Sequence, residues 1–252
     1  MIDLRQGDCL ELMKDIPDKS IDMILCDLPY GTTRNKWDSV IPLDKLWEQY
    51  SRIIKDNGAI VLFSQMPFTI ELVHSNFKLF RYEWIWKKTM STGFLNAKKM
   101  PLKQHENIVV FYKNLPLYNP QMREGFQPYN TARGSKNTNY GKFDNTYISS
   151  SNGDRYPVDV IEFKHDKEKL HPTQKPVALL EYLIKTYTNE GDTVLDNCAG
   201  SMSTVIASIN RNCIAIEKDK KYFEIGKKRV IEHLKTNNIS ANLVIFDNEC
   251  AI

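Results

Sequence analysis

Chemistry could come from four consecutive residues, Asp27-Leu28-Pro29-Tyr30, which combine a carboxylate, a backbone carbonyl and an aromatic ring. The carboxylate and the Leu28 carbonyl could each accept one hydrogen of an exocyclic nucleobase amine, which would aim the nitrogen lone pair at an electrophile. Pro29 has a fixed φ angle and holds the direction of that carbonyl. Tyr30 offers a flat face to a base rotated out of a duplex. An ordinary turn is the alternative interpretation.

The flanking residues place this segment at the end of a buried strand. Residues 21–25 form a short apolar run broken only by Asp22, which is typical of a parallel strand covered on both faces. Pro29 and Gly31 stop the strand, so residues 27–30 should lie at its carboxyl end. Open α/β sheets bind their ligands at that edge.

A second group of candidate residues lies nearer the C-terminus. Residues 193–217 predict a strand, a turn of small residues, a helix and a second strand that Glu217 closes. Gly200 and Ser201 let the backbone approach a ligand, and the helix N-terminus that follows favours a carboxylate or phosphate. Glu217 is placed to accept hydrogen bonds from ribose hydroxyls. The pattern indicates a nucleoside-binding βαβ unit.

Two further charged residues accompany these groups. Lys175, just before a predicted helix, adds a cation for a ligand carboxylate, although a lysine at a helix start is usually only solvated. Asp8 follows a short predicted strand at residues 2–4, so its carboxylate should lie on the same sheet edge as Asp27. The alternative for Asp8 is a helix N-cap.

Apolar periodicity indicates the elements that must position these residues. Helices are predicted at about residues 10–13, 42–54, 67–75, 176–187, from 204, and at 222–234. Strands are predicted at residues 2–4, 21–25, 59–63, 80–86, 107–112, 193–196, 213–216 and 243–246. This order predicts an α/β fold with a doubly wound, mostly parallel sheet and right-handed crossovers.

The net charge of +3 conceals an uneven distribution. Residues 81–142 carry 11 Lys and Arg against 3 acidic residues, so this stretch has a charge of +8 and the remainder −5. A basic region on a mildly acidic body suggests a polyanionic partner, and a solvated basic face is the alternative.

Residues 114–165 interrupt the regular pattern with Asn, Tyr, Gly, Lys and Arg. Amides, basic side chains and aromatic rings suit base edges, phosphates and stacking respectively, so we interpret this segment as an insertion that selects a DNA sequence. The candidate substrate contacts are Trp86, Lys87, Lys88, Arg133 and Lys136. For Trp86, which belongs to an aromatic stripe, a place in the core is the alternative.

Length and composition exclude several classes. A chain of 252 residues can bury a substantial core, most simply one α/β domain with an insertion. The five cysteines form no Cys-x-x-Cys pair, so neither a disulfide framework nor a zinc site is indicated. The chain has no long uncharged apolar span and no basic-then-apolar leader, which predicts a soluble, cytoplasmic protein without membrane contact. No strand is followed by Gly-x-Gly-x-x-Gly, which disfavours a nicotinamide dehydrogenase.

The motifs together resemble those of S-adenosylmethionine-dependent DNA amino-methyltransferases. Residues 27–30 resemble the family's Asp-Pro-Pro-Tyr motif, and residues 171–176, 195–204 and 216–217 resemble its cofactor-binding motifs. The catalytic motif precedes the cofactor motif, which is the family's β-type order. The resemblance implies a Rossmann-like domain. Its catalytic part would span residues 1–113, its target-recognition insertion 114–165 and its cofactor-binding part 166–252.

The resemblance also assigns roles to residues. The target base would be held by Asp27, Leu28, Pro29 and Tyr30. The methionine portion of the cofactor would be surrounded by Asp196, Ala199, Gly200 and Ser201, its carboxylate held by Lys175, its ribose by Glu217, and its adenine approached by Asp8. The transfer would be a direct displacement, which needs neither a metal nor a covalent enzyme intermediate.

An aspartate at the first catalytic position is typical of the adenine-N6 enzymes of this family. The sequence therefore predicts a bacterial or phage enzyme that methylates adenine N6 in double-stranded DNA. Cytosine-N4 methylation, RNA methylation and a DNA-binding protein without catalysis are the alternatives. A second copy of the chain and a cognate restriction endonuclease are further partners that the resemblance leaves open.

Two residues depart from the family pattern. Leu28 replaces a proline, which loosens the backbone but keeps the carbonyl. Met202 stands where the family usually has the second glycine of a Gly-x-Gly turn, and its side chain would either crowd the cofactor or point away from it.

Overall fold

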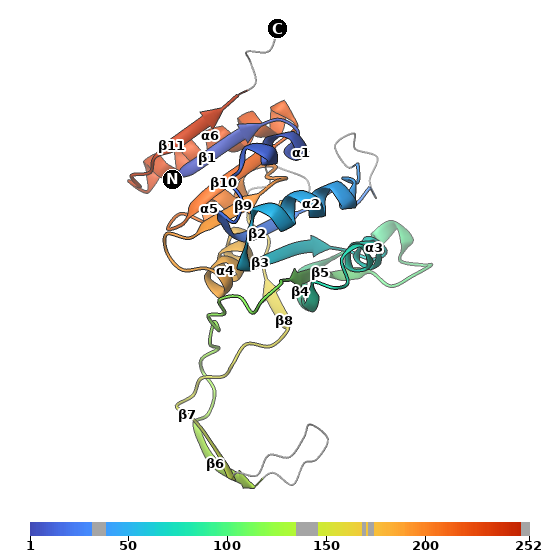
Figure 1. The fold of residues 1–252 in the computed structure, drawn as a ribbon. Helices are drawn as coiled ribbons and strands as arrows, with labels where there is room; N and C mark the ends of the chain where they lie inside the picture. Colours follow the sequence, from blue (N-terminus) through green and yellow to red (C-terminus); the bar gives the residue numbers. More distant parts are fainter. Residues whose placement is uncertain (32–38, 135–145, 168–169, 171–173, 248–252) are drawn as a thin grey trace. The chain divides into compact units, whose positions relative to one another are not determined.

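A nine-stranded sheet forms the centre of the protein in this computed structural model, which describes residues 1–31, 39–134, 146–167, 170 and 174–247 (Figure 1). The strand order is β11-β1-β10-β9-β2-β3-β5-β4-β8. The strands are β1 (Ile2–Gln6), β2 (Ile21–Asp27), β3 (Ile54–Ser64), β4 (Phe80–Thr92), β5 (Lys103–Phe111), β8 (Val160–Phe163), β9 (Thr193–Asp196), β10 (Asn212–Glu217) and β11 (Leu243–Phe246). Five neighbouring pairs from β11 to β3 are parallel, and β5 is antiparallel to both β3 and β4.

Helices cover both faces of this sheet. They are α1 (Cys9–Leu12), α2 (Leu43–Ile53), α3 (Phe68–Ser75), α4 (Val177–Tyr187), α5 (Ser203–Ala207) and α6 (Lys220–Thr236), with short 3₁₀ turns η1 (Met13–Asp15) and η2 (Phe94–Asn96). In β2, Ile24 and Cys26 pack in one buried cluster with α1, α2 and α3, while Met23 and Leu25 pack in another with α4. This alternation confirms the predicted doubly wound, mostly parallel α/β fold.

The two halves of the chain meet where β2 lies beside β9. The partners across that pair are Met23 with Val194 and Ile24 with Leu195. From β2 the chain goes to β3 on one side, and from β9 it goes to β10 on the other. Since the order of the strands diverges at this point, a crevice opens at their carboxyl ends.

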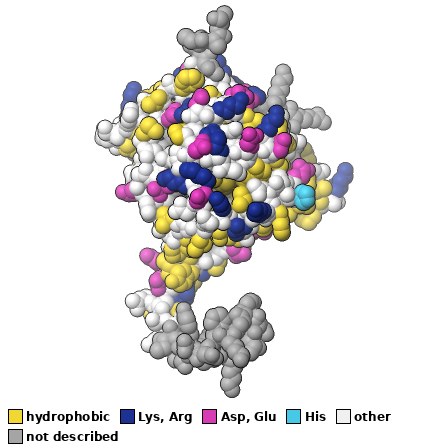
Figure 2. All heavy atoms as spheres, viewed as in Figure 1, with side chains coloured by type: hydrophobic (Ala, Val, Ile, Leu, Met, Phe, Trp, Pro, Cys, Tyr) yellow, Lys and Arg dark blue, Asp and Glu magenta, His cyan; other side chains and the backbone are white. Residues whose placement is uncertain are grey.

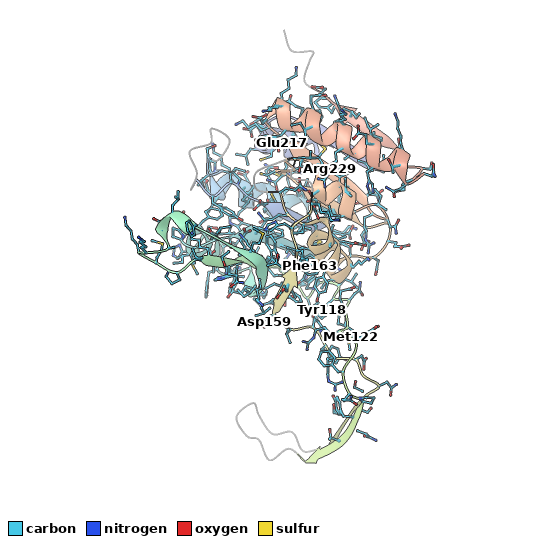
Figure 3. All side chains as sticks on the ribbon, turned by 180° about the vertical axis from the view of Figure 1, so that it is seen from behind. Tyr118, Met122, Asp159, Phe163, Glu217 and Arg229 are labelled. Atoms are coloured by element: carbon cyan, nitrogen blue, oxygen red, sulfur yellow. The ribbon has the colours of Figure 1, made fainter. Side chains whose placement is uncertain are left out.

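The elements agree with the predicted ones in place and differ in length. β3 begins at Ile54 because α2 passes directly into it, and β4 continues to Thr92, six residues beyond its predicted end at Trp86. Part of the irregular segment 114–165 also joins the main sheet, since β8 pairs in parallel with β4. Figure 3 marks Asp159, just before β8, and Phe163 at its end. No helix in the described ranges is long and apolar enough to span a membrane.

Residues 120–158 form a separate compact unit. Within it, β6 (Tyr129–Gly134) pairs with β7 (Thr146–Ser151) as an antiparallel ribbon. The guanidinium of Arg155 stacks over Tyr129 at 4.5 Å and over Phe126 at 5.3 Å from the ring centroids. Arg133 belongs to β6, although its side chain is not described, and Lys136 lies outside the described residues.

Candidate active site

A cavity of about 870 Å³ opens at the carboxyl ends of β2, β9 and β10. These adjacent ends carry Asp27, Asp196 and Glu217, so three carboxylates meet at one edge of the sheet. The structure brings together most residues that the sequence singled out. The cavity is lined by Asp8, Asp27, Leu28, Pro29, Tyr30, Trp86, Lys88, Lys175, Asp196, Ala199, Gly200, Ser201 and Glu217, among others.

Asp27 is held by two donors from different parts of the chain. The Tyr30 hydroxyl donates to Oδ1 at 2.7 Å, and the Lys175 ammonium donates to Oδ2 at 2.5 Å. The Tyr30 ring stacks on Phe68 of α3, with centroids 5.2 Å apart. Each carboxylate oxygen keeps a second lone pair, so Asp27 is fixed in orientation and can still accept a hydrogen from a ligand.

A chain of buried opposite charges extends from Asp27. The Lys175 Nζ lies 3.3 Å from Oε2 of Glu106, and the Lys88 Nζ lies 2.5 Å from Glu106 Oε1. Lys88 and Glu106 are 5% and 9% exposed, too little for water to screen them well. The network contains two carboxylates and two ammonium groups, so it is neutral overall. We name these four residues the catalytic corner.

Glu106 also carries the one buried side-chain oxygen or nitrogen that lacks a hydrogen bond in the described part of the chain. This atom is Oε2, which faces Lys175 at an ion-pair distance but without hydrogen-bond geometry. Buried polar groups of this kind usually have a partner, and Glu106 lines the cavity. Oε2 therefore has acceptor capacity left at the cavity wall.

The titration of the catalytic corner follows from burial and from these charges. Burial raises the pKa of Asp27 above its ordinary value, opposed by Lys175 and aided by the Glu106 charge. Burial also acts to raise the pKa of Glu106, but Lys175 and Lys88 outweigh it and hold that pKa low. Burial would lower the pKa of Lys175, but the two carboxylates outweigh it and raise that pKa. Lys175 is accordingly a cation at neutral pH.

At the other end of the cavity, the carboxylates of Asp196 and Glu217 accept hydrogen bonds from uncharged donors. The Thr204 hydroxyl donates to Asp196 Oδ2 at 2.6 Å, and the Cys198 N–H donates to Oδ1 at 3.1 Å. Glu217 accepts from the Gly200 N–H at 2.7 Å and from the Asp219 N–H at 2.8 Å. We name Asp196, Gly200 and Glu217 the cofactor corner. Burial raises the pKa of Asp196 to about 6 and also raises the pKa of Glu217.

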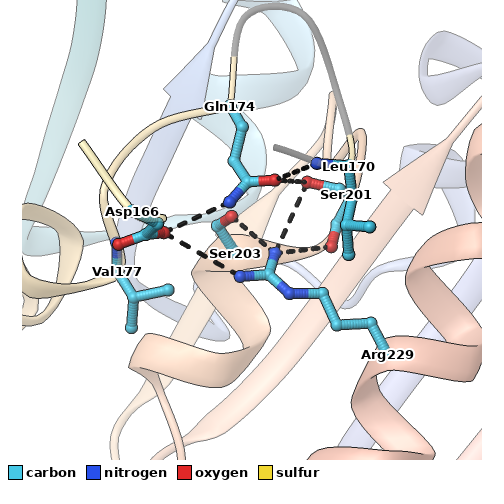
Figure 4. Close-up of polar contacts among 7 residues, drawn as sticks. All are labelled: Asp166, Leu170, Gln174, Val177, Ser201, Ser203 and Arg229. Atoms are coloured by element: carbon cyan, nitrogen blue, oxygen red, sulfur yellow. Dashed lines mark hydrogen bonds and ion pairs between the residues drawn. The ribbon is translucent and has the colours of Figure 1, made fainter. Parts of the chain in front are cut away.

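A hydrogen-bond network fixes the turn between the end of β9 at Asp196 and the start of α5 at Ser203 (Figure 4). Gln174 accepts from the Ser201 hydroxyl at 3.2 Å and donates to Asp166 at 3.2 Å. From α6, Arg229 donates to the Ser201 carbonyl at 3.0 Å and to the Ser203 hydroxyl at 2.8 Å. Ser201 is thus engaged within the protein, and the segment before α4 is tied to the start of α5. Figure 3 marks Arg229 and Glu217 on this side of the sheet.

Met202 points away from the cavity. Its backbone is left-handed, with φ of 59° and ψ of 37°, which explains why a glycine would suit this position. Its side chain is fully buried in a cluster with Val205 and Phe223, and it lies against Gly226 of α6. Of the two alternatives for Met202, the structure therefore favours the one that leaves the cofactor site uncrowded.

Several predicted contacts have partners that the sequence did not indicate. Asp8 is the N-cap of α1, accepting from the Leu10 N–H at 2.9 Å, and it also lines the cavity. Lys175, predicted to hold the cofactor carboxylate, has its ammonium on Asp27 and Glu106. Lys88 is buried against Glu106 and also lines the cavity, so its contact with the substrate stays a prediction.

The remaining two candidate contacts on β4 differ from each other. Trp86 is fully buried and donates through Nε1 to the Phe163 carbonyl at 3.1 Å, so it is a core residue that also borders the cavity. Lys87 is exposed and forms an ion pair with Glu162 at 2.8 Å.

Sequence reasoning gave no individual role to Glu106, Gln174 or Arg229. Glu106 had a weak signal, because it directly precedes the strand predicted at residues 107–112, and an acid that is buried with a strand needs a charged partner. Gln174 belongs to the segment 171–176 that resembles a cofactor-binding motif, but it had no role of its own there. Arg229 had no signal, because its partners Ser201 and Ser203 are distant in sequence.

Comparison with known proteins gives a consistent result. The family model described as DNA methylase matches residues 21–228. Type II methyltransferase M.HpaI of Haemophilus parainfluenzae is 26% identical over 245 residues, covering 89% of this chain and 72% of that protein. DNA adenine methyltransferase YhdJ of Escherichia coli (strain K12) is 29% identical over 243 residues, covering 89% and 81%.

Solved structures show the same fold. The M1.HpyAVI–SAM complex has 25% sequence identity and a TM-score of 0.63, covering 91% of this chain and 100% of that one. The cytosine-N4-specific PvuII DNA methyltransferase has a TM-score of 0.67 at 14% identity, covering 96% and 94%, which is a likeness of fold alone.

Proposed function

Because the chain belongs to the DNA methylase family, we propose that it transfers a methyl group from S-adenosylmethionine to the N6 amine of adenine in double-stranded DNA. One observation carries the choice of reaction. Asp27 stands at the end of β2, oriented by Tyr30 and Lys175, in the same cavity as the cofactor corner. An amine held at Asp27 would share this cavity with a bound methyl donor.

The chemistry of the cofactor corner fits S-adenosylmethionine. That molecule carries a positive sulfur, an ammonium group and ribose hydroxyls. Asp196 and Glu217 are buried carboxylates without a cationic partner among the described residues, and burial raises the pKa of each. A cation or hydroxyl donor relieves the cost of keeping such groups ionised. When bound, S-adenosylmethionine supplies an activated methyl group whose sulfur departs as a neutral thioether.

The residues of the catalytic corner position the amine and manage its proton. Asp27 accepts one amine hydrogen, and the Leu28 carbonyl would accept the other, which turns the nitrogen lone pair toward the methyl carbon. Once the N–C bond forms, the nitrogen must lose a proton. Burial raises the pKa of Asp27, so this carboxylate is a better acceptor for that proton than an ordinary aspartate. Orientation of two bound reactants supplies most of the rate enhancement.

The other roles follow from the same proposal. The flipped adenine would enter the cavity beside Tyr30, whose ring stacks on Phe68. Residues 114–165, which include the compact unit 120–158, would select the DNA sequence, with Arg133 and Lys136 as candidate contacts. The enzyme would act in the bacterial cytoplasm, where its DNA substrate is found.

The test is transfer of radiolabelled methyl from S-adenosylmethionine to mixed genomic DNA, followed by nucleoside analysis. We expect label in N6-methyladenine. Asp27→Ala should lower turnover by about a thousandfold or more while S-adenosylmethionine still binds, because it removes an orienting group at the reacting atom. Asp56→Ala, which removes an exposed carboxylate, is the matched control and should retain turnover. Label in N4-methylcytosine would overturn adenine as the target base. Retained turnover by Asp27→Ala would overturn the assignment of Asp27 to the reacting amine.

A further inference from the structure

An exposed apolar tip projects from the sheet between β4 and β5, as Figure 1 shows in green beside α3. It comprises residues 93–102, which we name the 93–102 tip. Leu95 is 98% exposed and Phe94 is 81% exposed. Met90, Met100 and Leu102 are also exposed, so apolar side chains are concentrated here beyond the scattered ones of an ordinary surface.

The shape of the tip is fixed by its own backbone. Gly93 has a φ of +88°, and Asn96 and Ala97 donate backbone hydrogen bonds to Gly93 and Phe94 at 2.9 and 3.0 Å. Met100 donates to the Asn96 carbonyl at 3.0 Å. These bonds form the compact turn that contains η2, so Phe94 and Leu95 are held outward by local structure.

The base of the tip belongs to the cavity wall. Thr92, opposite Lys103 in the ladder, lines the cavity. The Lys103 ammonium donates to Gln65 at 3.0 Å, and Gln65 lines the cavity too. The tip therefore begins at residues that line the same cavity as Asp27.

The charged residues within this stretch of the chain are all basic. Between Glu83 and Glu106 the chain has no acidic residue, whereas Lys98, Lys99 and Lys103 lie in or next to the tip. Figure 2 shows hydrophobic and Lys or Arg side chains close together on this face, with some Asp or Glu side chains beside them. Lysine beside exposed apolar groups matches a surface that is anionic outside and apolar inside, as a DNA duplex is with its phosphates and stacked bases.

We propose that Phe94 and Leu95 enter the space that the flipped adenine leaves in the duplex, while Lys98 and Lys99 contact the flanking phosphates. This inference rests on the proposed function. Rotating a base out of the stack removes its stacking contacts, and an apolar wedge inserted at the gap replaces them. Such a wedge must stand beside the base pocket, and this tip is anchored on residues of the cavity wall.

The experiment compares two duplexes that carry the methylation site mapped from the wild-type product. One is fully paired, and the other has an abasic position opposite the target adenine, so that unpairing is largely done beforehand. The variant is Phe94→Ser/Leu95→Ser. The matched control is Phe77→Ser/Leu115→Ser, which removes two other exposed apolar side chains of the same types.

For Phe94→Ser/Leu95→Ser we expect kcat/KM to fall about 10- to 100-fold on the paired duplex and less than about threefold on the abasic one, since only the first needs the wedge. S-adenosylmethionine affinity and the control variant should be unchanged. Lys98→Ala/Lys99→Ala should reduce the slope of log affinity against log salt by about 2.

An equal loss of kcat/KM on both duplexes, or no loss on either, would overturn the proposal that Phe94 and Leu95 enter the duplex. A change in sedimentation of the variant at the assay concentration would overturn it in favour of a contact between copies of the chain. Wild-type protein that methylates no DNA would instead refute the proposed function itself.

Discussion

The catalytic corner and the cofactor corner both bury carboxylates in one cavity, but they compensate them differently. Asp27 and Glu106 are neutralised by the ammonium groups of Lys175 and Lys88. Asp196 and Glu217 are held by hydroxyl and amide donors, which orient a negative charge without cancelling it. One corner is electrically complete in the protein alone, and the other would be completed by a cationic ligand.

This difference fits the ligands that each corner would receive. A nucleobase amine is neutral, so a site that already balances its own charges can accept it without a net charge mismatch. S-adenosylmethionine is cationic near sulfur and at its ammonium group, so an uncompensated carboxylate favours it. The corners should therefore respond in opposite ways to removal of a charge.

The largest effect should follow removal of Lys175, since this residue touches both carboxylates of the catalytic corner. Lys175→Met leaves Asp27 and Glu106 buried beside each other with one remaining cation. Breaking a buried ion pair from one side costs about 3–5 kcal/mol. We expect a loss of that size in the free energy of unfolding, measured by urea denaturation, together with loss of turnover.

Lys185→Met is the control for that variant. Lys185 forms an i,i+4 pair with Glu181 on the surface of α4, both about half exposed. Such a pair contributes about 0.5 kcal/mol or less. Equal effects of the two substitutions would contradict a self-contained charge network in the catalytic corner.

Glu106→Gln should have the next largest effect, because it changes the charge of the same corner while keeping the shape. The Glu106 charge is one of the causes that raise the pKa of Asp27, so its removal should lower that pKa. Ionised Asp27 would then persist to lower pH, and the acid limb of the kcat profile should move to lower pH. We expect kcat at pH 7.5 to fall about 10- to 100-fold because Lys175 and Lys88 lose their shared anchor.

A purely structural defect would lower kcat by the same factor at every pH and leave the limb in place. Glu106→Gln also leaves Lys88 buried without its ion-pair partner, which should lower the free energy of unfolding. Glu106→Gln/Lys88→Met, which removes both charges of that pair, should recover part of this loss. Failure of both expectations would show that Glu106 does not act through the charges of this network.

The sequence predicted those parts of the site that have a local signal. Asp27, Asp196 and Glu217 each end an apolar strand run, and a Pro or Gly follows the first two within four residues. The fold class followed in the same way from the alternation of strands and helices. These signals operate over a few residues, where periodicity and turn chemistry are decisive.

The rest of the site depends on strand register and long-range contact. Glu106 is opposite Trp86 on β4, two residues before Lys88, and nothing in either segment indicates that pairing. Lys175 meets Asp27 across 148 residues of chain. The sequence therefore identified Lys175 and assigned it to the cofactor carboxylate, whereas its contacts with Asp27 and Glu106 come from β2 and β5 and have no local signal.

In the cofactor corner, a smaller and reversible effect should follow from pH. Burial raises the pKa of Asp196 to about 6. The ionised form favours a cationic ligand, so affinity should be full above this pH and decline as pH falls through it. We expect the Kd for S-adenosylmethionine, measured by calorimetry, to rise by up to about tenfold per pH unit below 6.

Asp196→Asn separates this effect from general acid damage. The variant should bind more weakly at pH 7.5 and show a flatter pH dependence, because the titrating group is gone. Removing this charge should not lower the free energy of unfolding. The raised pKa means that ionised Asp196, the form present at pH 7.5, destabilises the fold. A wild-type Kd for S-adenosylmethionine that is constant from pH 7.5 to 5 would refute the claim that ionised Asp196 contributes to binding of this cation.

The smallest effect concerns Met202, where the cofactor corner meets α6. Met202→Gly relieves a left-handed backbone worth roughly 1–2 kcal/mol but empties a buried site, which costs about 2–5 kcal/mol, so a net loss of stability is expected. Affinity for S-adenosylmethionine should change less than about threefold, because the side chain lies against Gly226 and away from the cavity. A large gain in affinity would show that Met202 crowds the ligand after all.

Gly226→Ala tests the same contact from the other side. A Cβ at Gly226 would lie 2.6 Å from the Met202 Cγ and 3.1 Å from the Gly200 carbonyl oxygen, so α6 or the turn must shift. Alanine in a helix is otherwise favoured over glycine by about 1 kcal/mol. Gly226→Ala should therefore destabilise the wild-type protein but be nearly neutral or stabilising in Met202→Gly, with a coupling of about 1 kcal/mol or more in a double-mutant cycle. Additive effects would mean that the Gly200 carbonyl, and not the methionine, is what keeps residue 226 small.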